Sequence, residues 1–102
     1  MRTIVRGKNL EVPDRVRQYA ERKFARLERL LDDRTDAIVE LSNESHRSAA
    51  HAHIADVTLV IDGKTLKSHA SGASYQAALD IVVDKVERQA IEGAPDQRSD
   101  LL

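Results

Sequence analysis

The fold of this chain is organised around the segment SYQAALDIVVDKVERQAI at residues 74–91. Its apolar residues recur every three or four positions, which is the spacing of one face of an α-helix. These residues are Tyr75, Ala78, Leu79, Val82, Val86 and Ala90. Ser74 precedes the run as an N-cap whose hydroxyl can accept a backbone N–H, and Gly93 and Pro95 follow it as stop signals. We therefore predict a core-facing helix over residues 74–91.

A second helix is predicted over residues 14–31. Pro13 suits the start of its first turn, because the missing N–H would have no partner there. The apolar residues that follow again keep helical spacing and would form one buried face. They are Val16, Tyr19, Ala20, Phe24, Leu27, Leu30 and Leu31. Lys23 lies inside this apolar sector, where its stem can pack while its ammonium reaches the edge of the helix.

Four segments show the alternation of half-buried strands. They are residues 3–6, 35–44, 51–61 and 64–71. Their alternation predicts buried side chains at Ala37, Val39, Leu41, Ala55, Val57, Leu59 and Ile61. Asp62 and Gly63 separate the last two strands, and this pair favours a type I′ hairpin turn because glycine adopts positive φ freely.

The predicted order of elements is β-α-β-β-β-α. A helix joins the first two strands, so these should be parallel with a right-handed crossover, and the later strands should form an antiparallel meander. Both helices would then cover one face of a four-stranded mixed sheet, giving an α+β two-layer sandwich with two parallel helices. We expect one domain over residues 1–91 and a disordered polar tail over residues 92–102, which contains proline and lacks periodicity.

Composition excludes several classes of protein. The chain has no cysteine, and therefore neither a disulfide framework nor a thiolate metal site. Its apolar runs are far too short to span a membrane, and its N-terminus lacks the apolar core of a signal peptide. We therefore expect a cytoplasmic protein without a membrane partner. The net charge is −1, yet residues 1–31 carry nine basic and four acidic side chains, so positive charge is concentrated there.

The sequence predicts no catalytic residue, no small-molecule substrate and no enzyme. Nothing resembles a nucleophile elbow, and the acidic pairs occupy turn positions. The histidines raise an alternative, because His51 and His53, two apart on a strand, would share a face, and imidazoles can hold a metal. No further ligand completes such a site. We interpret them, with His46 and His69, as solvent-facing and predict neither metal nor cofactor.

Basic side chains gather on one flank of each predicted helix. The first helix carries Arg15, Arg22, Arg26 and Arg29 on one flank and Asp14, Glu21 and Glu28 on the other. The second carries Lys85 and Arg88 on one flank and Asp80, Asp84 and Glu87 on the other. Arginines one turn apart can follow a phosphate backbone. In parallel helices, however, a basic flank of one should face an acidic flank of the other, so interhelical ion pairs would leave one basic flank free.

Several segments resemble the ribosome hibernation-promoting factors, also called ribosome-associated inhibitors or subunit-interface proteins. In order over residues 1–91 they are GKNLEV at 7–12, KFARLE at 23–28, Gly63, Ser71, Gly72 and YQAALDIVVDKVERQ at 75–89. The resemblance implies the same fold and a surface that meets ribosomal RNA. The positions it assigns to that surface are Lys23, Arg26, Lys85, Arg22, Arg29 and Arg88.

The resemblance implies a non-enzymatic bacterial inhibitor of translation whose partner is the small ribosomal subunit. Similar proteins occupy its decoding channel and keep idle ribosomes dormant under stress or in stationary phase. We expect a short form of the family or the N-terminal domain of a long form. Short forms typically continue the last helix into a Lys/Arg-rich tail, whereas IEGAPD at 91–96 predicts an end to both helix and positive charge.

The alternative is a protein-interaction module of the same fold with weak or lost RNA binding. Ile4, Ile38 and Val60 on the open sheet face would support it if they formed an apolar patch, which could pair two copies in a weak homodimer. A free-standing binder of double-stranded RNA is a nearer alternative. Salt separates RNA binding from apolar pairing, because phosphate contacts weaken steeply as salt rises.

Overall fold

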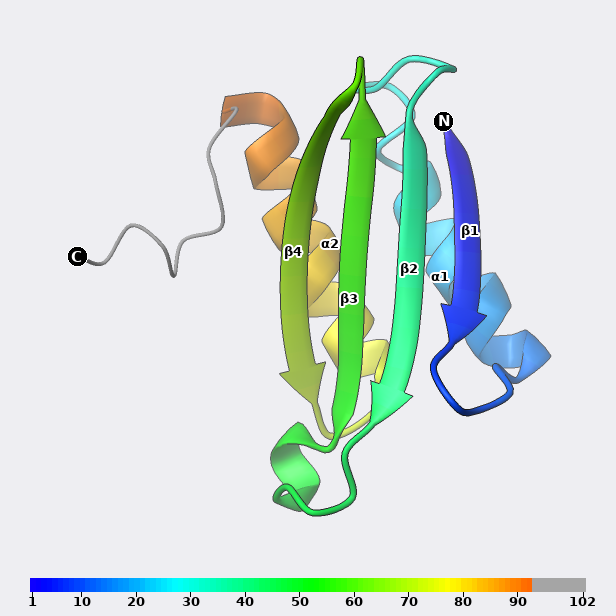
Figure 1. The fold of residues 1–102 in the computed structure, drawn as a ribbon, viewed down its shortest axis with the longest axis vertical. Helices are drawn as coiled ribbons and strands as arrows, with labels where there is room; N and C mark the ends of the chain where they lie inside the picture. Colours follow the sequence, from blue (N-terminus) through cyan, green and yellow to red (C-terminus); the bar gives the residue numbers. More distant parts are fainter. Residues whose placement is uncertain (93–102) are drawn as a thin grey trace.

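Four strands form one sheet, and their order in space, β1-β2-β3-β4, is their order in the chain (Figure 1). The structure is a computed structural model that describes residues 1–92. Its elements are β1 (Arg2–Gly7), α1 (Asp14–Ala25), β2 (Asp36–Asn43), the 3₁₀ helix η1 (Ala49–His51), β3 (His53–Ile61), β4 (Lys64–Gly72) and α2 (Tyr75–Glu92). The predicted β-α-β-β-β-α order is confirmed. The tail predicted over 92–102 lies, beyond Glu92, outside the described residues.

The strands pair as the topology predicts. β1 and β2 are parallel, with Arg2 opposite Asp36, and both β2–β3 and β3–β4 are antiparallel. The hairpin between β3 and β4 turns at Asp62 and Gly63, whose φ angles of 49° and 79° are both positive. Positive φ at both central residues is what a type I′ turn requires, and glycine adopts it without steric cost.

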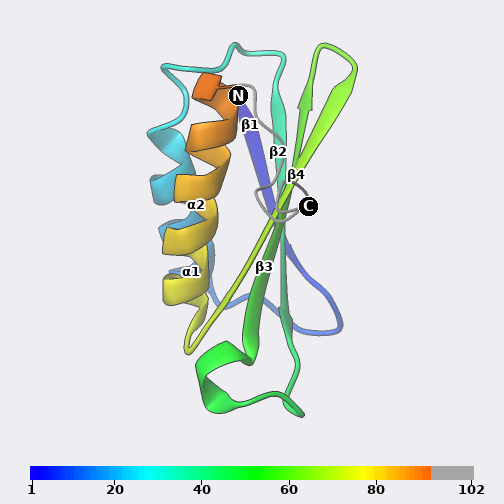
Figure 2. The same cartoon turned by 90° about the vertical axis from the view of Figure 1, so that its left-hand side faces the viewer.

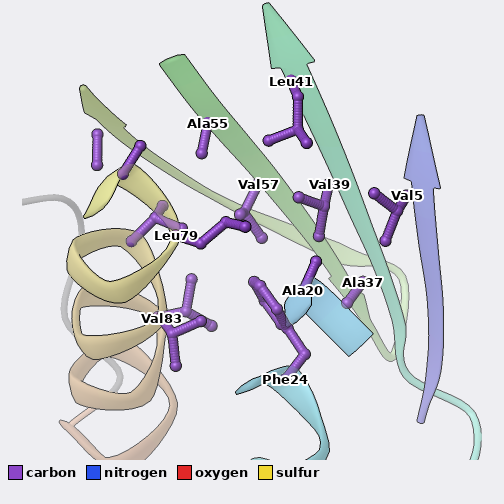
Figure 3. Close-up of a cluster of buried hydrophobic side chains, with 14 of the residues drawn as sticks. Val5, Ala20, Phe24, Ala37, Val39, Leu41, Ala55, Val57, Leu79 and Val83 are labelled. Carbon is purple, nitrogen blue, oxygen red and sulfur yellow. The ribbon is translucent and has the colours of Figure 1, made fainter. Parts of the chain in front are cut away.

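Both helices cover the same face of the sheet and run side by side (Figure 2). α2 packs on β3 and β4, and α1 lies against β1 and α2. The apolar faces meet between the layers in an aliphatic core around Phe24 (Figure 3). Its fully buried side chains include Phe24, Leu27, Val39, Leu41, Val57, Leu59, Leu79, Val82, Val83 and Val86. Burial of each large side chain contributes about 1.5–3 kcal/mol, so this core fixes the helices beside each other.

α2 matches its prediction. Ser74 caps its N-terminus, because the Ser74 hydroxyl accepts the backbone N–H of Ala77 at 3.0 Å. Ile81 points away from the core and is 45% exposed. The buried residues of the predicted face are Ala78, Leu79, Val82 and Val86, with Tyr75 and Ala90 half-buried. Within residues 1–92, no helix is long and apolar enough to cross a membrane.

α1 is shorter than predicted. The helix expected over residues 14–31 ends at Ala25, and turns follow over residues 26–30. In these turns the N–H groups of Leu27 and Leu30 each donate to the carbonyl three residues back, at 3.0 and 2.9 Å. Periods of 3.0 and 3.6 residues nearly coincide over a single turn. Leu27 therefore still reaches the core, whereas Leu30 is 39% exposed.

Helix side chains bind the backbone at both edges of the sheet. Arg17 of α1 donates to the backbone oxygen of Val5 in β1 at 2.6 Å. At the opposite edge, Lys85 of α2 donates to the backbone oxygen of His69 in β4 at 2.8 Å. Gln89 donates to a second β4 oxygen at 3.3 Å. These bonds occupy edge carbonyls that a further strand could otherwise use.

Candidate nucleic-acid interface

The predicted RNA-contacting residues lie in the helical layer, where α1 and α2 are side by side (Figure 2). Lys23 of α1 forms an ion pair with Asp80 of α2, with 3.2 Å between Nζ and Oδ1. The Lys23 side chain is 29% exposed. Its stem is therefore largely covered while its ammonium reaches the helix edge, as its position in the apolar sector predicted.

Two arginines continue this row past the end of α1. Arg26 Nη2 lies 2.5 Å from Asp84 Oδ1 and 3.2 Å from Glu87 Oε1. Arg29 Nη2 lies 3.8 Å from Glu87 Oε2. We call this arrangement the interhelical ladder, and its members are Lys23, Arg26, Arg29, Asp80, Asp84 and Glu87. The expectation that a basic flank of one helix faces an acidic flank of the other is confirmed.

Tyr19 joins the ladder at its first pair, although the sequence indicated a core residue. Its hydroxyl donates to Asp80 Oδ1 at 2.6 Å. This hydrogen bond lowers the pKa of Asp80, with help from Lys23 and against the opposing effect of partial burial. The same bond raises the pKa of Tyr19. The signal in the sequence was the spacing of Tyr19 and Lys23, which places both on one side of α1.

The remaining predicted residues have different surroundings. Lys85 lies on the far flank of α2 and donates to a β4 carbonyl, so its ammonium is held at the sheet edge. Arg88 is exposed and forms no ion pair with any residue in the range 1–91. Arg22 is also exposed, with its guanidinium 5.4 Å from the centre of the Tyr19 ring, a cation–π contact. Of the six predicted positions, three therefore form ion pairs with carboxylates of α2, namely Lys23, Arg26 and Arg29. The other three form no such ion pair among residues 1–91, namely Lys85, Arg22 and Arg88.

The histidine interpretation needs correction. His51 lies in η1 and not in a strand, so it does not share a strand face with His53. His53 is not solvent-facing: it is half-buried, its ring stands edge-on to Tyr75 at 4.7 Å, and its Nδ1 is buried without a partner among the described residues. His69 is 35% exposed and bonds Asp56 at 2.6 Å. Residues 1–92 contain no group of three or more potential ligands that could hold a metal.

The open face of the sheet is mixed in character. Ile4 and Ile38 are neighbours in register on it, and both are half-buried. Arg6 forms an ion pair with Glu40 one step along the strands, at 3.3 Å. A shallow hollow of about 550 Å³ on this face is lined by both acidic and basic side chains. Charged pairs therefore flank Ile4 and Ile38 on both sides along β1 and β2, which makes a broad apolar patch a poor description of this surface.

The fold and the helical layer together define a class of protein. It is a two-layer α+β domain of β-α-β-β-β-α order whose two parallel helices carry charge on one side of a mixed sheet. The solved Protein Y N-terminal domain of Thermus thermophilus is similar, with a TM-score of 0.75 and 30% identity over 92% of this chain and 100% of that chain. A ribosomal subunit interface protein from Coxiella burnetii shares the fold, with a TM-score of 0.74, 16% identity and coverage of 91% and 97%.

The chain belongs to the Sigma 54 modulation protein / S30EA ribosomal protein family, whose model matches residues 3–92. The ribosome hibernation promoting factor of Escherichia coli K12 is 32% identical over 89 residues, which cover 87% of this chain and 88% of that factor. The ribosome hibernation promotion factor of Deinococcus radiodurans is 35% identical over 83 residues. That match covers 81% of this chain, which spans 44% of the longer relative.

Membership of this family confirms two predictions from the sequence. The family resemblance was correct, and the chain belongs among non-enzymatic proteins. The names of its bacterial relatives connect the family with ribosome hibernation and the regulation of translation.

Proposed function

We propose that this chain binds the small ribosomal subunit in the cytoplasm, occupies its decoding channel and keeps the ribosome in hibernation under stress. Binding is carried by basic side chains of the helical layer that contact ribosomal RNA phosphates. The observation that carries the proposal is the match to the family over residues 3–92, which includes almost every described element. The match to the Escherichia coli factor extends over most of both chains.

The structure ranks the residues that would make these contacts. Arg22 and Arg88 are exposed and have no carboxylate partner within residues 1–91, so their guanidinium groups face no competing carboxylate there. Lys85 keeps hydrogen-bonding capacity beyond its single bond to β4, because an ammonium has three donors. The ladder residues Lys23, Arg26 and Arg29 would contribute less, because carboxylates already neutralise them.

Co-sedimentation with purified bacterial small ribosomal subunits over a series of salt concentrations tests this function. We expect the wild type to pellet with the subunits at low salt and to be released as salt rises. Prebound chain should also reduce the binding of messenger RNA and initiator tRNA. Arg22→Ala/Arg88→Ala should weaken pelleting.

Lys8→Ala/Arg47→Ala is the matched control, since it removes the same charge from exposed positions outside the two helices. If a folded wild-type chain stays in the supernatant at low salt, the proposal is wrong. Salt-insensitive self-association measured in the same samples would then favour the interaction module. If both double variants weaken pelleting equally, net charge and not the helical layer decides binding.

A further inference from the structure

The interhelical ladder places three carboxylates where RNA phosphates would meet the basic flank of α1. Asp80, Asp84 and Glu87 all belong to α2, and each lies within 4 Å of a basic nitrogen contributed by residues 23–29. A carboxylate and a phosphate use the same donors of arginine and lysine. The acidic flank of α2 therefore presents the same chemistry to these cations as the proposed partner does.

The geometry at Arg26 shows how the competition works. Both of its ion pairs use the single nitrogen Nη2, and its side chain remains 39% exposed. A phosphate could approach the other guanidinium nitrogens, but it would then lie close to Asp84 and Glu87. Like charges at short range repel each other. A phosphate can therefore reach the Arg26 guanidinium, but the neighbouring carboxylates repel it.

The carboxylates are held in place by several contacts and by the packing of α2. Asp80 accepts the Tyr19 hydroxyl at 2.6 Å in addition to its ion pair with Lys23. Glu87 is bonded by both Arg26 and Arg29, and its side chain is 24% exposed. Fully buried α2 residues of the same turns, Val82, Val83 and Val86, pack in the core and fix the helix. The helix that carries the acidic flank therefore cannot turn away from the arginines as a unit.

We propose that the acidic flank of α2 is a built-in competitor for RNA phosphates, which neutralises the basic flank of α1 and lowers the affinity of the chain for ribosomal RNA. This inference rests on the proposed function and adds regulation of its binding surface. Removing the carboxylates would free Arg26 and Arg29 for phosphate contacts. The gain would exceed the effect of the change in net charge.

The test compares two variants that raise the net charge equally. Asp84→Asn/Glu87→Gln removes the carboxylates that bind Arg26 and Arg29. Glu21→Gln/Glu28→Gln removes two exposed carboxylates that form no ion pair within the described chain. The dissociation constant of each full chain for purified bacterial small ribosomal subunits is measured at one salt concentration. Circular dichroism and thermal melting establish that both variants are folded, with Glu87→Gln alone as the milder form of the first.

We expect the ladder variant to bind about 3- to 10-fold more tightly than the charge-matched control, which corresponds to the release of one or two exposed ion pairs. Adding Arg26→Ala should then cost more affinity in the ladder variant than in the wild type.

Two outcomes would overturn it. Equal gains in the two double variants would mean that net charge alone matters, and the proposed function would stand without the competitor. Absence of binding by the wild type and by both folded variants would instead contradict the proposed function itself, and the inference would fall with it.

Discussion

The basic side chains at the C-terminal end of α1 and those on α2 have opposite surroundings. On α1, Lys23 and the arginines that follow it face the carboxylates of α2 at 2.5–3.8 Å. On α2, Lys85 faces the sheet edge and Arg88 faces solvent. The residue types and their helical spacing are alike in the two places. The element packed alongside therefore decides whether a basic side chain on a helix is free to bind a phosphate.

This difference follows from the topology. In a β-α-β-β-β-α sandwich both helices run in the same direction on one sheet face, so flanks of the same hand point in the same direction. One basic flank must then face the other helix, and the second must face outward. The sequence of α2, with acids on one side and bases on the other, makes the inner contact attractive.

The largest expected effect is on stability, and it comes from removing a core side chain that holds the two helices beside each other. Phe24 of α1 is fully buried in the core between the helical layer and the sheet (Figure 3). Phe24→Ala should lower the free energy of unfolding by about 3–5 kcal/mol, because it leaves a cavity in the core. Denaturant unfolding measures this loss. Ile81→Ala, at an exposed apolar position on α2, is the control and should change stability little.

A smaller effect is expected at the hydroxyl that anchors the first pair of the ladder. Tyr19→Phe removes the donor to Asp80 and should lower the melting temperature, since hydrogen bonds to charged groups contribute more than neutral ones. Tyr75→Phe is the matched control, because no hydrogen bond from its hydroxyl occurs among residues 1–92. Equal losses in the two variants, measured by thermal melting, would show that the contact to Asp80 contributes nothing.

The direct test of the comparison removes an unpaired arginine and a paired arginine in separate variants. Arg88→Ala should weaken binding to small ribosomal subunits more than Arg26→Ala, because Arg26 is already neutralised in the free chain. Losing one phosphate contact should reduce the slope of log affinity against log salt by about 0.7–0.9. Arg26→Ala should lower stability by about 0–1 kcal/mol, whereas Arg88→Ala should not. Larger binding loss at Arg26 would contradict the ranking.

The smallest expected effect is on the stability of the fold at acid pH. The pKa of Asp80 is lowered in the folded chain by the Tyr19 hydroxyl, so its ionised form stabilises the fold above the ordinary value of 3.8. That contribution should disappear as pH falls through the lowered pKa. Solvent screening keeps it small, because the side chain is 48% exposed. Asp80→Asn should therefore be less stable than the wild type near neutral pH, and the two unfolding curves should converge as pH falls below about 3.8.

Most of the fold could be predicted from the sequence, because each element has a separate local cause. The alternation in residues 36–43 and the turn at Asp62 and Gly63 determine the sheet, and the apolar face of residues 75–92 determines α2. The end of α1 could not be located, because a tight turn keeps Leu27 on the core side as an α-helix would.

The candidate site was less predictable, because it depends on distances between elements. Topology alone predicted that the basic flank of one helix would be paired, but it could not say that this would be the basic flank of α1. His51 was misplaced because the short η1 at Ala49–His51 ends before β3 begins at His53. His53 shares the face of buried Ala55 and Val57, so the alternation itself indicated that its side chain lies on the core side. The pairing of Tyr19 with Asp80 joins residues 61 positions apart, which no local pattern shows.

The helix side chains bound to the sheet edges have a consequence for aggregation. A finite sheet can grow by adding strands from other copies, as amyloid does, wherever an edge offers a row of free carbonyl and N–H groups. Arg17 of α1 binds the edge of β1, and Lys85 of α2 binds the edge of β4. An added strand would have to displace these charged donors and remove their water. Replacing Lys85 and Gln89 with methionine would leave the helix intact but remove the protection of the β4 edge. The first sign would be thioflavin-positive fibres in concentrated protein, well before any loss of helical signal.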